Sequence, residues 1–148
     1  MKGILIALFL VLTQQTVLAQ TCKITNISHF NFGNYDVANP IPADSVGSIT
    51  IACEKNTKVT IQLDRGLYGT FMKRAMKHAH FPDLLYYNIF VDPGRTIIWG
   101  DGSGGTESVN VNVKAKNPIT INIYGRIFPL QNVSVGPYSD TIIVIILP

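Results

Sequence analysis

Thr141-Ile142-Ile143-Val144-Ile145-Ile146-Leu147 is the apolar stretch in which the sequence ends, and only Pro148 follows it. Its composition is typical of a buried β-strand, which needs cover on both faces and a neighbouring strand on each edge. No further element follows in the sequence to supply that neighbour. We therefore expect the last strand to be a docking site, because an exposed apolar edge is a template for pairing with another chain.

Residues 1–19 have the pattern of an export signal. A basic n-region contains Lys2, residues 4–12 form an apolar h-region, and small residues precede an expected cleavage after Ala19. The h-region is short for a retained membrane anchor, since a spanning helix takes about 20 residues. We expect an exported protein with one mature domain at residues 20–148.

The charge balance of the chain argues against a nucleic-acid partner. The formal net charge is +3, and charged residues make up only 14% of the sequence. The basic residues are dispersed apart from Lys73, Arg74 and Lys77, which we interpret as a solvated face.

Cys22 and Cys53 are the two cysteines of the chain. An even pair in an exported protein predicts a disulfide, because the compartment is oxidising. A redox function would require a C-x-x-C motif or a lone activated thiol, and the sequence has neither. We therefore predict a structural bridge.

Apolar and polar residues alternate along most of residues 20–148, which predicts half-buried β-strands. The clearest strands are residues 109–116 and 119–123, which we expect to form a hairpin around Asn117-Pro118. Further strands are predicted at residues 22–27, 45–53, 58–63, 84–91 and 96–99, and residues 71–80 are interpreted as a strand or turn. About eight or nine short strands at such spacing indicate a β-sandwich.

A set of motifs occurs in order along the mature chain: Cys22, Asn31-Phe32-Gly33-Asn34-Tyr35, Cys53, Leu85-Tyr86-Tyr87-Asn88-Ile89-Phe90, Trp99-Gly100-Asp101-Gly102, Gly104-Gly105-Thr106, Tyr124-Gly125-Arg126 and Gly136-Pro137-Tyr138-Ser139-Asp140-Thr141. With these motifs the chain resembles the spore coat protein U domain family, which includes the subunits of archaic chaperone-usher pili. The resemblance covers essentially all of residues 20–148. Its most specific parts are the segment at Trp99 and the segment that ends at Thr141.

The resemblance implies an all-β, incomplete immunoglobulin-like sandwich that lacks its final strand and is completed by a donor strand. The donor would come first from a periplasmic chaperone and then, at the outer-membrane usher, from a neighbouring subunit, which places the protein on a cell-surface or extracellular fibre. Strand addition of this kind uses main-chain hydrogen bonds for affinity and side-chain pockets for register. One wall of the acceptor groove would comprise Tyr138, Thr141, Ile142, Ile143, Val144, Ile145, Ile146 and Leu147.

The segment before the first cysteine departs from the pattern of the polymerising subunits of such pili. Those subunits carry an N-terminal donor segment there, whereas the expected cleavage leaves only Gln20 and Thr21. At about 3.3 Å per residue, two residues are too short to fill the groove of another subunit. We therefore expect a subunit that accepts a strand without donating one, at the tip of a fibre.

A second function, besides that of a fibre subunit, is also compatible with the sequence. The chain could instead be a free-standing secreted coat protein or adhesive domain that closes its own sandwich. Adhesion to a surface, as in a biofilm, would use exposed apolar loops. The candidates are Phe30, Phe32, Tyr35, residues 67–69 and residues 128–130, all of which we interpret as plugs at the ends of the core.

Catalytic and metal-binding interpretations receive little support from the sequence. His29, His78 and His80 are the only histidines, and we interpret them as surface residues rather than metal ligands. Gly100-x-Gly102-x-x-Gly105 matches a dinucleotide motif by letters, but a predicted strand follows it where such a site needs a helix. Asp92, Asp101 and Glu107 lack the spacing of a calcium loop. We expect neither an enzyme nor a cofactor.

Overall fold

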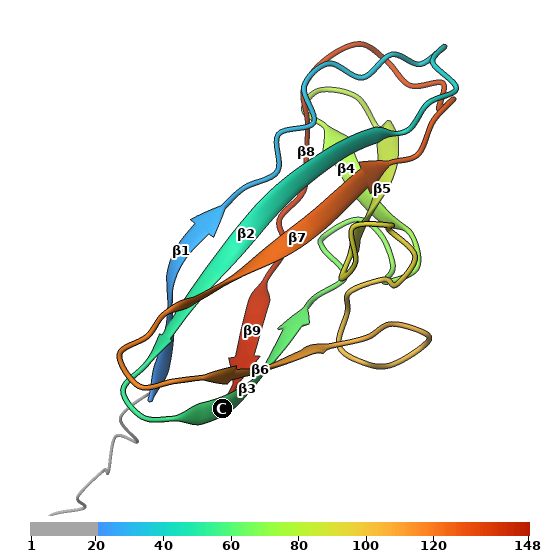
Figure 1. The fold of residues 1–148 in the computed structure, drawn as a ribbon. Coiled ribbons are helices and arrows are strands. Elements are labelled where there is room, and N and C mark those ends of the chain that lie inside the picture. The colour runs from blue at the N-terminus through green and yellow to red at the C-terminus, as the bar shows by residue number, and fades with distance from the viewer. Residues whose placement is uncertain (1–20) are drawn as a thin grey trace, which may run out of the picture.

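The computed structural model describes residues 21–148, and these residues form an all-β fold (Figure 1). Among them no helix is present, so none could span a membrane. The nine strands are β1 (Cys22–Ser28), β2 (Ala43–Cys53), β3 (Thr57–Leu63), β4 (Arg74–His78), β5 (Leu84–Phe90), β6 (Val109–Val113), β7 (Ile119–Ile127), β8 (Tyr138–Ser139) and β9 (Val144–Leu147). The expected export signal at residues 1–19 lies outside the described residues.

The strands form two sheets that pack face to face. One sheet has six strands in the order β1-β2-β7-β5-β4-β8, and the other has three in the order β6-β3-β9. Figure 1 shows the long β2 and β7 strands side by side, with β9, β3 and β6 grouped beside their lower ends. The predicted β-sandwich is therefore confirmed.

Alternating side chains build the core between the two sheets. Along β3 the residues Val59, Ile61 and Leu63 are buried, while the side chains between them are more exposed. Trp99 is fully buried among them, and its indole nitrogen donates a 3.1 Å hydrogen bond to the carbonyl of Ile61. A buried indole needs such a partner, because an unpaired polar group in the core is costly.

The predicted hairpin of residues 109–116 and 119–123 is wrong, although both strands exist. β6 pairs with β3 in the smaller sheet, whereas β7 pairs with β2 and β5 in the larger one. The chain crosses between the sheets at Asn117-Pro118, after Lys116 adopts a left-handed backbone with φ of 60°. The amide of Lys116 donates to the carbonyl of Cys53, which ties the crossing to the end of β2.

The predictions for residues 71–80 and residues 96–99 have different outcomes. Residues 71–80 contain a true strand, β4, which pairs with β5 and β8. Residues 96–99 form only isolated bridges, from Ile98 to Phe90 and from Trp99 to Glu107. The Trp99 amide donates a hydrogen bond to the carbonyl of Ile89, so the backbone of this segment is paired with β5 although it does not form a strand.

The predicted disulfide between Cys22 and Cys53 is confirmed. Both residues are buried, and they face each other as partners in the β1–β2 ladder. The bridge therefore fixes the first residue of β1 to the last residue of β2, at the end of the sandwich where the chain enters the fold.

Candidate strand-binding groove

The last strand, β9, lies at an edge of the three-stranded sheet. Its pairing with β3 runs antiparallel from Thr60–Leu147 to Leu63–Val144. Within residues 21–148 no strand pairs with the opposite edge of β9. The backbone groups along that edge are therefore available to a further strand, as at any sheet edge.

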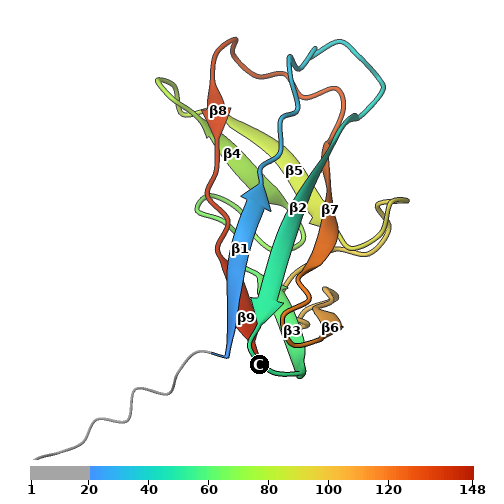
Figure 2. The same ribbon diagram turned by 60° about the vertical axis from the view of Figure 1, so that its left-hand side comes forward.

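An apolar cavity of about 320 Å³ opens between β1 and the chain from β8 to β9. Figure 2 shows β1 running beside β8 and β9 on this side of the molecule. We call this cavity the strand groove; its walls are residues Ile27, Ser28, His29, Phe30 and Phe32 on one side and Tyr138, Ser139, Asp140, Ile142 and Val144 on the other, over a floor of Leu63, Met76, Tyr87, Ile89 and Ile123. The floor belongs to the hydrophobic core, so the groove exposes core side chains at the open edge.

A β-bulge in β1 turns Ile27 toward the groove. The β1–β2 register shifts between Ile24 and Asn26, so Thr25 is the extra residue. In a regular strand, side chains three residues apart point to opposite faces. With one extra residue between them, Ile24 and Ile27 both point to the inner face of the sheet. Ile24 packs on the core, and Ile27 lines the groove.

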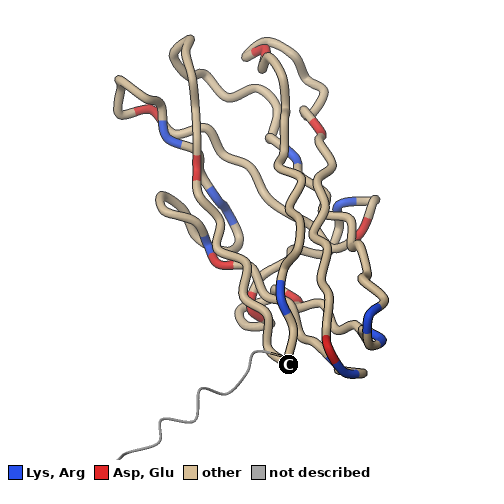
Figure 3. The backbone as a smooth tube through the Cα atoms, turned by 90° about the vertical axis from the view of Figure 1, so that its left-hand side faces the viewer, with Lys and Arg blue, Asp and Glu red and all other residues tan. Residues whose placement is uncertain are grey.

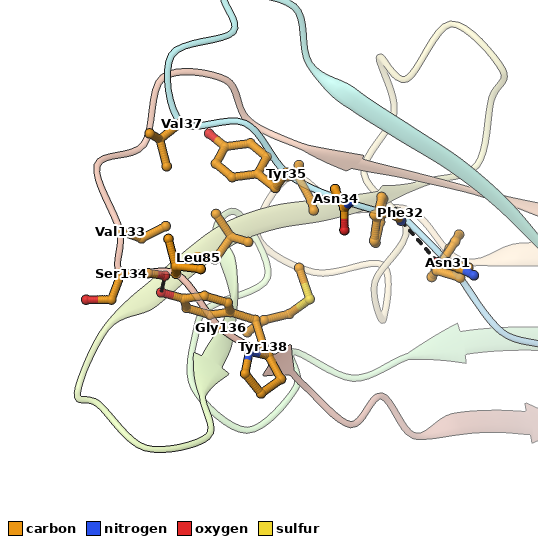
Figure 4. Close-up of a pocket in the computed structure, with 16 residues that line it drawn as sticks. Asn31, Phe32, Asn34, Tyr35, Val37, Leu85, Val133, Ser134, Gly136 and Tyr138 are labelled. Carbon is orange, nitrogen blue, oxygen red and sulfur yellow. Dashed lines mark hydrogen bonds between the residues drawn. The ribbon is translucent and has the colours of Figure 1, made fainter.

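A second hollow of about 570 Å³ continues the strand groove toward the far end of the sandwich. It shares Phe30, Phe32, Met76 and Tyr138 with the groove. Figure 4 shows Tyr35 and Val37 on one side of it and Val133 and Ser134 on the other. The hydroxyl of Tyr138 donates a 2.8 Å hydrogen bond to the carbonyl of Ser134. This bond joins the wall of the second hollow to Tyr138, which also lines the strand groove.

The eight residues predicted as one groove wall divide into two rows. Tyr138, Ile142 and Val144 line the groove, and Ile146 packs on the core beyond it. Ile143, Ile145 and Leu147 point to the outer face and are 57%, 40% and 46% exposed, and Thr141 is also exposed. This division follows from the period of two along a strand.

Two aspartates that sequence reasoning missed fasten the crossing from β8 to β9. The carboxylate of Asp140 accepts hydrogen bonds from the Tyr87 hydroxyl at 2.7 Å and the Leu67 amide at 2.9 Å. The carboxylate of Asp64 accepts one from the Ile143 amide at 2.9 Å. Burial and the hydrogen bond to Asp140 raise the pKa of Tyr87 far above its ordinary value. The motif around Asp140 was a visible signal, but its partners lie far away in the sequence.

Arg74 lies in the core next to Asp64, one of the two aspartates at the crossing. The prediction that Arg74 belongs to a solvated face is therefore wrong. Arg74 is fully buried, and its guanidinium donates to the carbonyls of Asp64 and Trp99 and to the side chain of Asn88 at 2.6–3.0 Å. Desolvation lowers the pKa of Arg74. Lys73 and Lys77 are exposed as expected, and Figure 3 shows the charged residues dispersed over the fold.

The family motif residues serve the fold rather than the groove. Trp99 fills the core, and a side chain at Gly100 would collide with Thr106. Asp101 accepts hydrogen bonds from Ser103 within a turn in which Gly102 has φ of 88°. In the second motif, Tyr124 is half-buried, Gly125 leaves room for the rings of Phe30 and Phe32, and Arg126 forms a 2.7 Å ion pair with Asp44.

The remaining candidates fall into two groups. Phe30, Phe32 and Tyr35 pack on the core, as the plug interpretation predicted, whereas Leu67, Tyr68 and Leu130 are exposed.

His78 is buried rather than at the surface, and its two ring nitrogens contact the carbonyl of Val135 and the amides of residues 80 and 81. In the part of the chain that the structure describes, no group of three or more His, Cys, Asp or Glu side chains is placed to hold a metal ion.

The two sheets and the open edge define an immunoglobulin-like sandwich, and comparison with known proteins identifies its family. The chain belongs to the Spore Coat Protein U domain family, whose pattern matches residues 7–145. It is 31% identical over 125 residues to Protein U of Myxococcus xanthus, a match that covers 76% of this chain and 68% of that protein.

A solved structure supports the same relationship. The fold is similar, with a TM-score of 0.59 and 25% identity, to a chain in the CsuC–CsuE chaperone–tip adhesion subunit pre-assembly complex from the archaic chaperone-usher Csu pili of Acinetobacter baumannii. The match covers 84% of this chain and 38% of that chain, so the present chain spans well under half of its length. The family and this structural relative are structural or adhesive proteins, and the chain is of that class rather than an enzyme.

Proposed function

We propose that this chain is a structural subunit of a chaperone-usher type surface fibre and that it accepts a donor strand in the strand groove. The observation that carries the proposal is the free edge of β9 beside an apolar groove with core residues as its floor. A periplasmic chaperone would supply the strand first, and a neighbouring subunit would replace it at the outer-membrane usher. The likeness to a chaperone–subunit complex supports this order of partners.

The groove has the physical features that strand addition needs. The free backbone edge of β9 can form a ladder of main-chain hydrogen bonds, which provides affinity without regard to side chains. Ile27, Tyr87 and Val144 line the cavity into which every second side chain of the added strand would point. Burying these apolar groups favours binding at roughly 25 cal/mol per Å² of surface removed from water.

Expression in the periplasm tests the proposal directly. Produced alone, the chain should aggregate or be degraded, because its groove exposes core side chains. Co-expression with the chaperone of a chaperone-usher system should give a soluble complex. A chaperone whose donor strand carries polar residues at the inward positions is the matched control and should not rescue it. A monomeric, protease-resistant product without any chaperone would contradict the proposal.

We further propose that the subunit occupies the tip of the fibre. The expected cleavage after Ala19 would leave only Gln20 and Thr21 before β1, and two residues cannot serve as a donor strand. Such a subunit would accept a strand and donate none, which leaves only the distal end. Immunogold labelling of purified fibres should mark one end; labelling along the shaft in many copies would contradict the tip position.

A free-standing coat function is the second candidate. It is favoured by the 31% identity to Protein U and by the spore coat family to which the chain belongs. In that case the protein would remain folded and monomeric without a chaperone. The periplasmic expression experiment therefore separates the two candidates.

A further inference from the structure

The outer face of the three-stranded sheet changes from polar to apolar at β9. Asn110 of β6, Thr60 of β3 and Leu147 of β9 lie in one row across the sheet. The hydroxyl of Thr60 donates a 2.7 Å hydrogen bond to the side chain of Asn110, which leaves Leu147 beside them with no apolar neighbour in that row. Ile145 lies in the same way beside Gln62. We call Ile143, Ile145 and Leu147 the outer row.

The other edge strands present polar side chains on their outer faces. Asn110 and Asn112 are the exposed residues of β6, which forms the opposite edge of the same sheet. In the larger sheet, β1 exposes Lys23 and β8 exposes Ser139. Polar residues are the usual protection of a sheet edge against pairing with other chains. Among residues 21–148, β9 alone combines an unpaired edge with an apolar outer row.

We propose that the strand that adds to β9 is apolar on both faces: its inward side chains enter the strand groove, and its outward side chains cover the outer row. This inference rests on the proposed function and specifies the chemistry of the partner strand. The outer row is one strand wide, because its neighbours on β3 are the polar Thr60 and Gln62. Its width therefore fits the side chains of one added strand rather than the flat face of a domain, and it is continuous with the free edge of β9.

The expected gain in affinity comes from cross-strand pairs. Side chains directly opposite each other on paired strands contact across about 5 Å, and apolar pairs are favourable relative to small ones. Ile143, Ile145 and Leu147 would each gain one such neighbour. Three pairs together correspond to an affinity difference on the order of tenfold.

A peptide competition measures this difference. Residues 20–148 with the disulfide formed are refolded with a labelled peptide that alternates valine inward with threonine outward. A second peptide of equal length, with valine inward and isoleucine at the three outward positions opposite the outer row, is then titrated against it. We expect the second peptide to bind about tenfold more tightly. A peptide of equal length with threonine at the inward positions and isoleucine at the three outward positions should not compete, because threonine is too polar for the strand groove.

Variants of the chain link the difference to β9. The double variant Ile145→Thr/Leu147→Thr should reduce the difference between the peptides to about twofold, because only Ile143 of the outer row remains apolar. Ile41→Thr is the matched control, since Ile41 is 69% exposed and lies in the loop between β1 and β2, away from β9. That variant should keep the full difference between the peptides.

The other possible results would each contradict one specific statement. Equal binding of the two peptides would overturn this inference and leave the proposed function standing. Equal competition by the peptide with inward threonines would show that the strand groove does not select apolar side chains, which would overturn the proposed function. Failure of both peptides to bind folded protein would overturn the proposed function as well. A peptide-free dimer that disappears in the Ile145→Thr/Leu147→Thr variant would show that a second copy of the chain covers the outer row, which also overturns the inference.

Discussion

Asp140 lies where the chain leaves the six-stranded sheet and enters the three-stranded one. Its carboxylate joins Tyr87 on the floor of the strand groove to the Leu67 amide in the loop after β3. Gly66 is required in that loop, because it has φ of 76° and a side chain there would collide with Asp140. A few polar contacts thus place the edge strand of the groove, although the groove itself is apolar.

Removal of the Tyr87 hydroxyl tests this role. Tyr87→Phe leaves one oxygen of the half-buried Asp140 carboxylate without its donor, which should lower the free energy of unfolding by about 1–3 kcal/mol. Urea denaturation of the oxidised protein would measure the loss. Tyr68→Phe is the control, because Tyr68 is 42% exposed. Equal stability of the two variants would show that the contact does not fasten the crossing.

The ion pair of Arg126 with Asp44 predicts a pH dependence at the other face of the larger sheet. The hydrogen bond from Arg126 lowers the pKa of Asp44 below its ordinary 3.8. The folded-state pKa is depressed, so the stabilisation is present above pH 3.8 and is lost as the pH falls through the lower folded value. The contribution should be under about 1 kcal/mol, since both side chains are partly exposed.

The variant Arg126→Gln should therefore be less stable at neutral pH and should lose less stability on acidification than the unmodified protein. Part of the dependence should remain, because Arg95 also lies 3.3 Å from Asp44. Thermal melts between neutral pH and pH 3 would measure both slopes. Parallel slopes for the two proteins would exclude a role for this pair in acid sensitivity.

At the scale of single elements, the two rows of β9 should respond differently to a charge. Val144→Asp places a carboxylate in the apolar groove and should lower the stability of the subunit by several kcal/mol, on the order of 3 kcal/mol or more. Ile145→Asp leaves the carboxylate at the outer face, where the side chain is 40% exposed, and should cost about 1 kcal/mol or less.

The second variant should still fail to assemble, because the donor strand would have to cover the new charge. Urea denaturation and recovery of the chaperone complex together measure the two effects. Equal destabilisation by the two substitutions would contradict the division of β9 into an inner and an outer row.

The strands were predictable from the sequence, but their partners were not. Alternation along residues 109–116 and 119–123 identified β6 and β7 correctly as half-buried strands. The pattern did not show that Asn117-Pro118 carries the chain from one sheet to the other, since pairing depends on contacts with β2 and β3. The buried Arg74 was missed for the same reason: its partners Asp64, Asn88 and Trp99 are distant in the sequence.

The candidate site shows the same limit. The apolar stretch at residues 141–147 predicted an edge strand in need of a partner, and β9 is indeed at an edge. Sequence reasoning treated the whole stretch as one wall. The structure starts the strand only at Val144, because Asp64 and Asp140 hold the preceding residues in a crossing between the sheets.

The disulfide should contribute substantially to the stability of the whole fold. Cys22 and Cys53 are 31 residues apart, and the chain-entropy model assigns a loop of that size roughly 3.5 kcal/mol. Because the bridge anchors β1, its loss should also loosen one wall of the strand groove. Melting of the chaperone-bound protein with and without reductant should show a lower transition in the reduced sample; coincident transitions would contradict this prediction.

We expect the free edge of β9 to pair with a strand from another protein. A photoreactive amino acid at position 145, introduced in cells that express the chaperone and usher, would detect that strand by cross-linking. We expect cross-links to the chaperone in the periplasm and to a neighbouring subunit in assembled fibres, with none from the same group at position 112 on β6. Cross-links of equal yield from both positions, or an assembled protein with none from position 145, would show that no strand from another protein pairs with β9.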